Sequence, residues 1–191
     1  YLDTGLFLDH RLTRELIRSL APNTRFLNLF AYTGTATAYA VSGGARSSLT
    51  VDLSSTYLEW ARANLALNGL GGESHHFLKA DCLVWLERPD QNAAPFDLIF
   101  LDPPTFSSSK SMEGTLDIQR DHVALIRGCL RILSPEGQLI FTCNQRKFRL
   151  DFESLADLYI EDIGKKTLPR DFERNPRIHA GWLIRRAKNP A

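Results

Sequence analysis

The feature of this chain that most constrains its fold is a regular alternation of short apolar runs with segments of helical periodicity. Short apolar runs bounded by turn residues are typical of buried strands. We expect such strands over residues 26–30, 48–51, 76–79, 96–101 and 138–143. Because helical patterns fill the intervals, the strands should lie parallel in one sheet, joined by right-handed crossovers.

The expected helices follow from apolar periodicity and from capping residues. They cover residues 10–20, a segment ending at 43–44, a segment from 54–56 to 68–69, residues 82–87 and residues 117–133. Thr56 and Glu59 could form a capping box, and Asp117 should cap the long helix.

The C-terminal part departs from this alternation. We expect a helix over 152–159 and strands over 165–168 and 179–185. Only residues 169–178 separate the last two strands, so an antiparallel hairpin is favoured. The predicted fold class is therefore α/β, with a mostly parallel seven-stranded sheet, a reversed last strand and helices on both faces.

Polar side chains stand at the ends of successive predicted strands. Asn28 lies in the first strand, Asp52 ends the second, Asp81 follows the third and Asp102 follows the fourth. Each acid could be a helix cap, but together they would meet at the edge where open α/β sheets bind ligands. Asp52 is placed to accept from ribose hydroxyls, Asp81 from an adenine amino group, and Asn28 to hold an amine.

The first strand runs into the turn Asn28 to Ala36, which contains Phe30, Thr33 and Gly34. Gly34 permits close approach or a positive φ. The turn lacks the Gly-x-Gly-x-x-Gly pattern that cradles a pyrophosphate, which argues against a nicotinamide-dependent dehydrogenase. It suits S-adenosylmethionine (SAM), a nucleoside with an amino-acid tail, better than NAD.

The tract Asp102-Pro103-Pro104-Thr105-Phe106 is the strongest candidate for a catalytic segment. The Asp102 carboxylate and the proline carbonyls can accept hydrogen bonds, since proline offers no N–H. Phe106 supplies a flat face for a planar group. An acceptor cluster beside a stacking ring can hold a nucleobase drawn out of its stack.

Two residues before the sheet are further candidates for the cofactor site. Asp9 could contact the cofactor or cap the first helix. Arg11 could pair with the cofactor's carboxylate.

Composition limits the setting in which the chain works. It has no apolar run that could cross a membrane and an unclustered set of three cysteines, Cys82, Cys129 and Cys143. We expect no signal peptide. We expect one domain over residues 1–191, a fragment of a longer cytoplasmic protein, and no metal site. Residues 1–143 carry 12 basic and 15 acidic side chains, whereas residues 144–191 carry 11 and 7. Such asymmetry can indicate a surface that faces nucleic acid.

The whole chain resembles the catalytic domain of bacterial 23S rRNA methyltransferases of the RlmI/RlmK type, which have a Rossmann-like class I fold. The resemblance is closest to the C-terminal guanine-N7 domain of the bifunctional members. The segments that carry it are Tyr1 to Arg11, Asn28 to Gly34, Asp102 to Ser107, Asp117 to His122 and Arg170 to His179.

The resemblance implies methyl transfer from SAM to guanine N7 in 23S rRNA. It also implies an upstream RNA-binding THUMP region and a second methyltransferase domain in the full-length protein. Asp102, Pro103 and Phe106 would hold the base, while Lys110, Arg146, Lys147 and Arg149 would contact phosphates.

Besides the nicotinamide-dependent dehydrogenase, which thermal shifts induced by NADH or SAM would test, two alternatives stay open at this point. Related enzymes that methylate cytosine C5 carry a nucleophilic cysteine after the fifth strand, where this chain has Cys143 within Thr142-Cys143-Asn144. We interpret Cys143 as a buried strand-end residue, but Cys143→Ala would test it. The second alternative is a non-catalytic RNA-binding platform, which would bind RNA without incorporating methyl groups.

Overall fold

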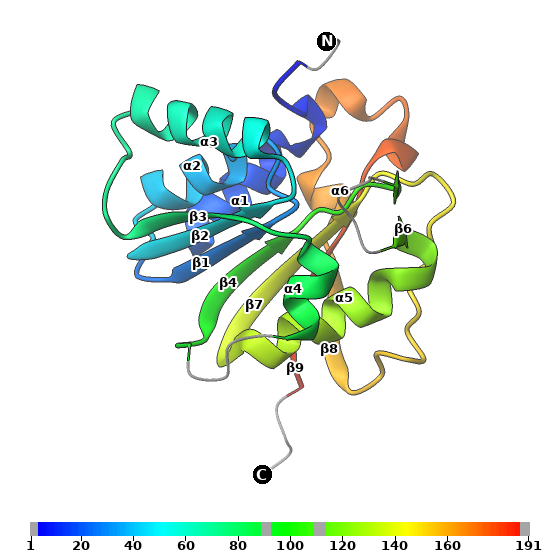
Figure 1. The fold of residues 1–191 in the computed structure, drawn as a ribbon. Coiled ribbons are helices and arrows are strands. Elements are labelled where there is room, and N and C mark those ends of the chain that lie inside the picture. The colour runs from blue at the N-terminus through cyan, green and yellow to red at the C-terminus, as the bar shows by residue number, and fades with distance from the viewer. Residues whose placement is uncertain (1–3, 89–92, 109–113, 188–191) are drawn as a thin grey trace.

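The computed structural model describes residues 4–88, 93–108 and 114–187, which form a central seven-stranded sheet (Figure 1). In spatial order the strands are β3 (His75–Lys79), β2 (Ser47–Asp52), β1 (Arg25–Leu29), β4 (Phe96–Leu101), β7 (Leu133–Cys143), β9 (Ala180–Arg186) and β8 (Leu158–Asp162). Neighbours from β3 to β7 pair in parallel, whereas β9 is antiparallel to both β7 and β8. The predicted mixed sheet with a reversed last strand is confirmed.

Helices cover both faces of this sheet (Figure 1). α1 (Arg11–Leu20), α2 (Thr35–Ser42) and α3 (Ser55–Leu67) lie on one face, and α4 (Cys82–Glu87) and α5 (Ile118–Ile132) lie on the other. None of the helices formed by the described residues combines the length and apolar character needed to span a bilayer.

Two apolar clusters form the core because successive strand residues point to opposite faces of the sheet. Phe26, Leu98 and Ile140 pack with α1 and α2. Their chain neighbours Leu27, Ile99 and Phe141 belong to the larger cluster beneath α4 and α5. The alternation fixes the register of each strand, and therefore the position of the residue at its end.

The structure corrects the expectations for residues 152–168. The predicted helix over 152–159 is a series of turns followed by β8, and the predicted strand over 165–168 is the short helix α6 (Gly164–Thr167). Asp151 accepts hydrogen bonds from the N–H and hydroxyl of Ser154, which stabilises a turn rather than a helix. Leu158 and Ile160 then pack on the core at strand spacing.

Smaller differences concern caps and connections. Ser54, not Thr56, caps α3, accepting from the N–H of Tyr57 at 3.3 Å. Two short paired strands, β5 (Phe106–Ser108) and β6 (Thr115–Asp117), follow the Asp-Pro-Pro tract. Asp117 caps α5 as predicted, accepting from the N–H of Gln119 at 2.9 Å.

The remaining elements formed by the described residues are three short 3-10 helices. The first, η1 (Leu8–His10), leads into α1, and its Asp9 makes no capping bond to that helix. The others, η2 (Arg170–Phe172) and η3 (Pro176–Ile178), connect α6 to β9.

Candidate active site

A cavity of about 720 Å³ opens at the edge of the sheet where the parallel strands end. Crossover connections place all these carboxyl ends together, and open α/β sheets bind ligands there. Seven predicted site residues line the cavity, namely Asp9, Asn28, Phe30, Asp52, Asp81, Asp102 and Pro103. The structure therefore brings together groups from four strand ends and from the segment before α1.

The turn between β1 and α2 has an unusual backbone. Phe30, Tyr32 and Gly34 have positive φ angles of 55°, 50° and 69°. A Cβ at Gly34 would lie 2.5 Å from the Cβ of Ala61 on α3, so only glycine fits there. The fully buried Thr33 donates its hydroxyl to the carbonyl of Gly5 at 2.7 Å. Thr33 and Gly34 thus shape the cavity without lining it.

The Asp52 carboxylate connects this turn to the cavity. Its Oδ2 accepts from the N–H of Tyr32 and its Oδ1 from the N–H of Ser54, both at 2.8 Å. Burial raises the pKa of Asp52 above its ordinary value, and these backbone hydrogen bonds only partly offset that effect. A carboxylate has about four acceptor sites, so ribose hydroxyls could use the remaining ones and favour the charged form.

Asp81 both caps a helix and lines the cavity. Its Oδ1 accepts from the N–H of Leu83 at the start of α4, at 2.9 Å. The helix-cap interpretation and the cofactor interpretation are therefore compatible, since a second oxygen is left for a ligand.

Asn28 presents an unsatisfied acceptor. The residue is 1% exposed, and its Nδ2 donates to the hydroxyl of Thr37 at 3.0 Å. Its Oδ1 is buried without a hydrogen-bond partner. Because an unpaired buried polar atom costs roughly 1–3 kcal/mol, this oxygen is well suited to accept from a ligand amine.

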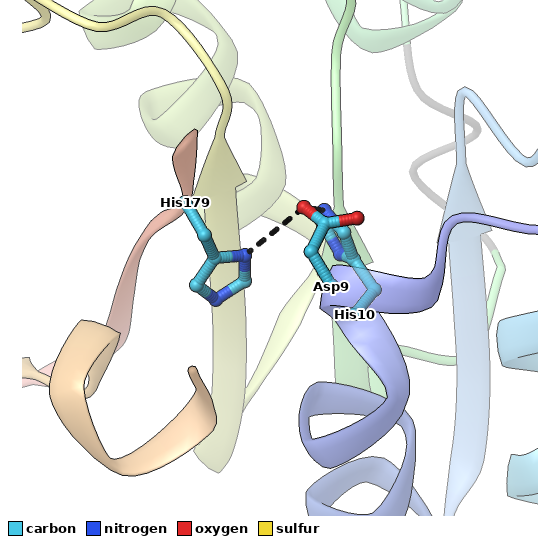
Figure 2. A group of neighbouring side chains, drawn as sticks. All are labelled: Asp9, His10 and His179. Carbon is cyan, nitrogen blue, oxygen red and sulfur yellow. Dashed lines mark ion pairs between the residues drawn. The ribbon is translucent and has the colours of Figure 1, made fainter. Parts of the chain in front are cut away.

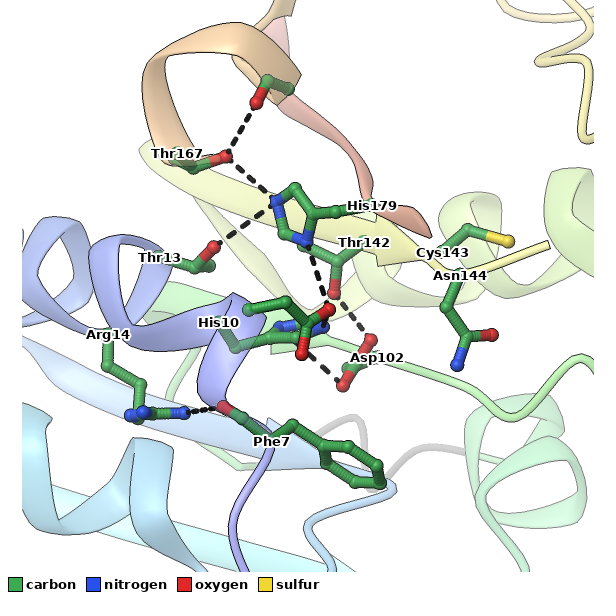
Figure 3. Close-up of polar contacts among 12 residues, drawn as sticks. Phe7, His10, Thr13, Arg14, Asp102, Thr142, Cys143, Asn144, Thr167 and His179 are labelled. Carbon is green, nitrogen blue, oxygen red and sulfur yellow. Dashed lines mark hydrogen bonds and ion pairs between the residues drawn. The ribbon is translucent and has the colours of Figure 1, made fainter. Parts of the chain in front are cut away.

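Asp102 and Pro103 begin the candidate catalytic segment after β4. Oδ1 of Asp102 accepts from the hydroxyl of Thr142 on β7 at 2.6 Å (Figure 3). Pro103 is buried and lines the cavity. Thr105 donates its hydroxyl to Oδ1 of Asn144 at 2.8 Å, which ties the segment to the residue that follows β7.

Cys143 lies beside this segment but is not a cavity residue. Its side chain is buried, and burial raises the pKa of the thiol to about 11. The thiolate needed for nucleophilic attack is therefore disfavoured at neutral pH. This placement agrees with the strand-end interpretation.

Asp9, His10 and His179 form a cluster (Figure 2). His10 Nδ1 lies 3.9 Å from Asp102 Oδ2. Asp9 Oδ2 lies 3.6 Å from His10 Nε2 and 3.8 Å from His179 Nδ1. Ligand atoms of the three residues lie within 4.8 Å of one another, so they could hold a metal ion. The expectation of no metal stays a prediction.

His179 is held as a neutral imidazole. The hydroxyl of Thr167 donates to the carbonyl of Ile163, so its oxygen accepts from His179 Nε2 at 2.9 Å (Figure 3). Burial, followed by the nearby His10, lowers the pKa of His179 to about 4.

Arg14, and not the predicted Arg11, is the arginine of α1 that lines the cavity. Arg11 does not line the cavity and forms an ion pair with Asp171 at the surface. Its predicted role therefore finds no support in its position. Arg14 is 4% exposed, lines the cavity and donates from Nη1 to the carbonyl of Phe7 at 2.7 Å (Figure 3). Sequence reasoning missed Arg14, because an arginine in an amphipathic helix is usually exposed.

Phe106, the predicted stacking residue, lies outside the lining of the cavity. Phe106 is 60% exposed, and its neighbours Thr105 and Ser107 line the cavity while Phe106 does not. Phe7 and Tyr32 do line the cavity, with ring centroids 5.3 Å apart. These two aromatics were missed because each lies in a stretch without regular periodicity.

Of the predicted phosphate contacts, Arg146, Lys147 and Arg149 are exposed in the segment after β7. The backbone of Arg149 exchanges two hydrogen bonds with the Gln119 side chain, which fixes the segment against α5. Lys110 lies outside the described residues.

The strand order, the acids at successive strand ends and the tight β1–α2 turn define a Rossmann-like α/β fold with a nucleoside site. The chain belongs to the S-adenosylmethionine-dependent methyltransferase family, whose model matches residues 1–162. Membership in this family rules out the alternative of a nicotinamide-dependent dehydrogenase. The unpaired Asn28 oxygen, the buried Arg14 cation and the free acceptors of Asp52 and Asp81 fit the amino-acid and adenosine parts of SAM.

Curated relatives and solved structures agree with this assignment. Ribosomal RNA large subunit methyltransferase K/L of Allochromatium vinosum is 61% identical over 184 residues, or 96% of this chain. The protein of that name from Syntrophotalea carbinolica is 62% identical over 97% of the chain. The chain spans only about a quarter of their length (25% and 26%). The crystal structure of SMU.776 complexed with SAH matches with a TM-score of 0.82 and 26% identity, covering 96% of this chain and 50% of that one.

Proposed function

We propose that residues 1–191 act as one methyltransferase domain that transfers a methyl group from SAM to guanine N7 in 23S rRNA. The observation that carries the proposal is the cavity at four strand ends, bordered by the Asp102-Pro103 segment, in a chain about 60% identical to rRNA methyltransferases. The longer relatives support further domains, for which we propose an upstream THUMP region and a second methyltransferase domain. A ribosomal RNA substrate would also support a cytoplasmic location.

The proposed cofactor roles follow from the hydrogen-bond acceptors that the lining residues leave unused. Asp52 would hold the ribose, Asp81 the adenine amino group, and Asn28 the ammonium group of the methionine part. Phe30 lines the adenosine end, while Thr33 and Gly34 keep the turn narrow. Asp9, which lines the cavity just before α1, would contact the methionine part of the cofactor.

The catalytic roles are mainly positional. When bound, SAM supplies an electrophilic methyl group whose C–S electron pair stays on sulfur. Guanine N7 attacks with its own lone pair, so no residue has to remove a proton. Asp102, held by Thr142, and the Pro103 carbonyl would accept base N–H groups and orient the ring. Orientation of this kind accounts for a large part of many enzymatic accelerations.

RNA would approach the cavity from outside, across residues that are exposed. Phe106 would stack on the base at the rim, a contact worth roughly 1–3 kcal/mol. Arg146, Lys147 and Arg149 would contact phosphates, as would Lys110.

The state of Cys143 supports guanine over cytosine. Methylation of cytosine C5 needs a thiolate that adds to the ring, whereas this thiol is buried, has a raised pKa and does not line the cavity. Guanine N7 needs no nucleophilic residue.

The test is methyl transfer to unmodified ribosomal RNA with tritiated SAM, followed by nucleoside analysis. We expect labelled 7-methylguanosine, full activity from Cys143→Ala, and a loss of about tenfold or more from Asp102→Ala. Labelled 5-methylcytidine that disappears with Cys143→Ala would establish the cytosine alternative. RNA binding without label would favour the non-catalytic platform.

A further inference from the structure

Asn144 is a cavity residue that has no role in the reaction proposed above. It follows β7 directly, is exposed, and lines the cavity together with Asp102 and Thr105. Because β7 is the parallel neighbour of β4, the two strands bring Asn144 and Asp102 to the same edge of the sheet.

The Asn144 amide is held in one orientation. The Thr105 hydroxyl donates to its Oδ1 at 2.8 Å, and this is the only hydrogen bond of the Asn144 side chain among residues 4–88, 93–108 and 114–187. Its Nδ2 therefore keeps two N–H groups to donate. In Figure 3 this nitrogen lies on the side of the amide that faces Asp102, and the oxygen lies on the other side.

The Asp102 carboxylate is also held by a hydroxyl, and it has the opposite hydrogen-bonding character. Its Oδ1 accepts from the Thr142 hydroxyl at 2.6 Å. Its Oδ2 lies 3.9 Å from Nδ1 of His10, which is beyond hydrogen-bond distance. The cavity wall thus combines a fixed donor, from Asn144, with a fixed acceptor, from Asp102.

This donor and acceptor match one edge of guanine. Guanine presents the acceptor O6 beside the donor N1–H. Adenine and cytosine present an amino group beside an unprotonated ring nitrogen, which is the reverse pattern, and uracil shares the guanine pattern but has no N7. A flipped base is read through this Watson–Crick edge. Among bases that carry N7, the pair therefore selects guanine.

We infer that Asn144 is a specificity-determining residue, whose Nδ2 donates to guanine O6 while Asp102 accepts from N1–H. The inference rests on the proposed function, because it concerns how the base in that reaction is recognised. With adenine in the cavity, the amide would face an amino group and the carboxylate would face the N1 lone pair. Both contacts leave polar groups unpaired, and sites reject such mismatches strongly.

The test compares methyl transfer to 23S rRNA that carries one of three bases at the methylated position. Nuclease fragments of the RNA labelled with tritiated SAM locate that position, and splinted ligation introduces guanine, hypoxanthine or 2,6-diaminopurine there. Hypoxanthine lacks only the 2-amino group, whereas 2,6-diaminopurine reverses the pattern at C6 and N1.

Four variants are compared with the wild-type protein. Asn144→Ala removes the donor, and Asn144→Asp replaces it by an acceptor. Thr105→Val removes the hydroxyl that orients the amide. Asn175→Asp, at an exposed position after η2, is the matched control.

The wild-type protein should prefer guanine over 2,6-diaminopurine by about 100-fold or more in kcat/KM. Asn144→Ala should lower kcat/KM for guanine by about 3- to 10-fold, the effect of one hydrogen bond, and reduce the preference to about tenfold. Asn144→Asp should reduce the preference further, Thr105→Val should reduce it by a smaller factor, and Asn175→Asp should leave it unchanged. The loss caused by hypoxanthine should be the same in every variant, because Asn144 does not contact the 2-amino group.

An unchanged preference in Asn144→Ala would make Asn144 a structural residue and overturn the inference. Binding of S-adenosylhomocysteine checks that each variant is folded, and if Asn144→Ala lost this binding, an unchanged preference in Thr105→Val would overturn the inference instead. Wild-type protein that forms no 7-methylguanosine on guanine RNA would refute the proposed function and the inference with it. Methylation of guanine and 2,6-diaminopurine at equal rates would refute the inference alone.

Discussion

Gly34 and Gly69 have nearly the same positive φ, +69° and +67°, in different surroundings. A Cβ at Gly34 would meet Ala61 at 2.5 Å, whereas a Cβ at Gly69 would meet nothing within 4 Å. The pair therefore separates two reasons for glycine, backbone conformation alone at Gly69 and conformation plus close helix approach at Gly34.

We expect Gly69→Ala to lower the free energy of unfolding by about 1–2 kcal/mol, the cost of a left-handed conformation. Gly34→Ala should cost a further ~1–3 kcal/mol from overpacking against α3. Urea denaturation measures both values, and binding of S-adenosylhomocysteine reports the cavity. Equal losses in the two variants would show that the Gly34 turn can move away from α3.

Asp52, Asp81 and Asn28 illustrate how much of the site the sequence makes predictable. Their positions follow from strand periodicity, because parallel strands must end at one edge. Arg14 could not be found in this way, since a pattern in α1 identifies the buried face but not which polar side chain a cavity will accept. The cluster of Asp9, His10 and His179 joins residues 170 positions apart in the chain, a pairing that no local pattern contains.

At the scale of elements, His179 connects the start of β9 to α1, α6 and η1. Its Nε2 lies 2.9 Å from the Thr167 hydroxyl on α6 and 3.5 Å from that of Thr13 on α1. On the other side, Nδ1 faces Asp9 of η1. The neutral ring therefore joins the elements that flank Asp102.

This arrangement predicts acid sensitivity with a defined sign. The pKa of His179 is about 4 in the folded protein and near 6.5 when unfolded. Between these values the unfolded chain binds a proton that the folded one does not, so stability is full above about pH 6.5 and falls as the pH approaches 4. The loss from this residue is on the order of 3 kcal/mol.

Denaturation at a series of pH values measures this dependence. His179→Gln should flatten the curve between pH 6.5 and 4, while His76→Gln, at an exposed position, should leave it unchanged. The purified protein should be assayed for metal in parallel, because an ion held by the cluster would alter the response. An unchanged slope in His179→Gln would assign the acid response to other groups.

The elements that the sequence did not predict share a physical cause. Residues 152–168 form β8 and α6, where short polar stretches and side-chain hydrogen bonds from Asp151 decide the structure. Local periodicity is too weak over such lengths to distinguish a helix from a strand. The parallel strands alternate with helices, so their parallel arrangement could be predicted from the sequence.

At the scale of the whole molecule, the exposed Arg146, Lys147 and Arg149 follow β7, next to the cavity residue Asn144. Changing all three to alanine should weaken RNA binding and make its salt dependence shallower, by about 0.7–0.9 in slope for each phosphate that is no longer neutralised. Binding of S-adenosylhomocysteine should not change.

A matched control removes three other exposed arginines, Arg18, Arg46 and Arg62. Fluorescence titrations over a range of salt concentrations compare the two variants. If both variants lost the same affinity for RNA, RNA binding would depend on the net charge of the protein and not on the surface formed by Arg146, Lys147 and Arg149.

One wall of the cavity comes from residues that precede the sheet. The Tyr32 hydroxyl accepts from the N–H of Gly5 at 3.1 Å, and Thr33 bonds the Gly5 carbonyl from the same turn. Phe7, Asp9 and His10 then face the ligand space. A transfer of this domain into another protein must therefore include residues 4–10. A chain that began at α1 would lack this wall, and the cavity would be open to solvent on that side.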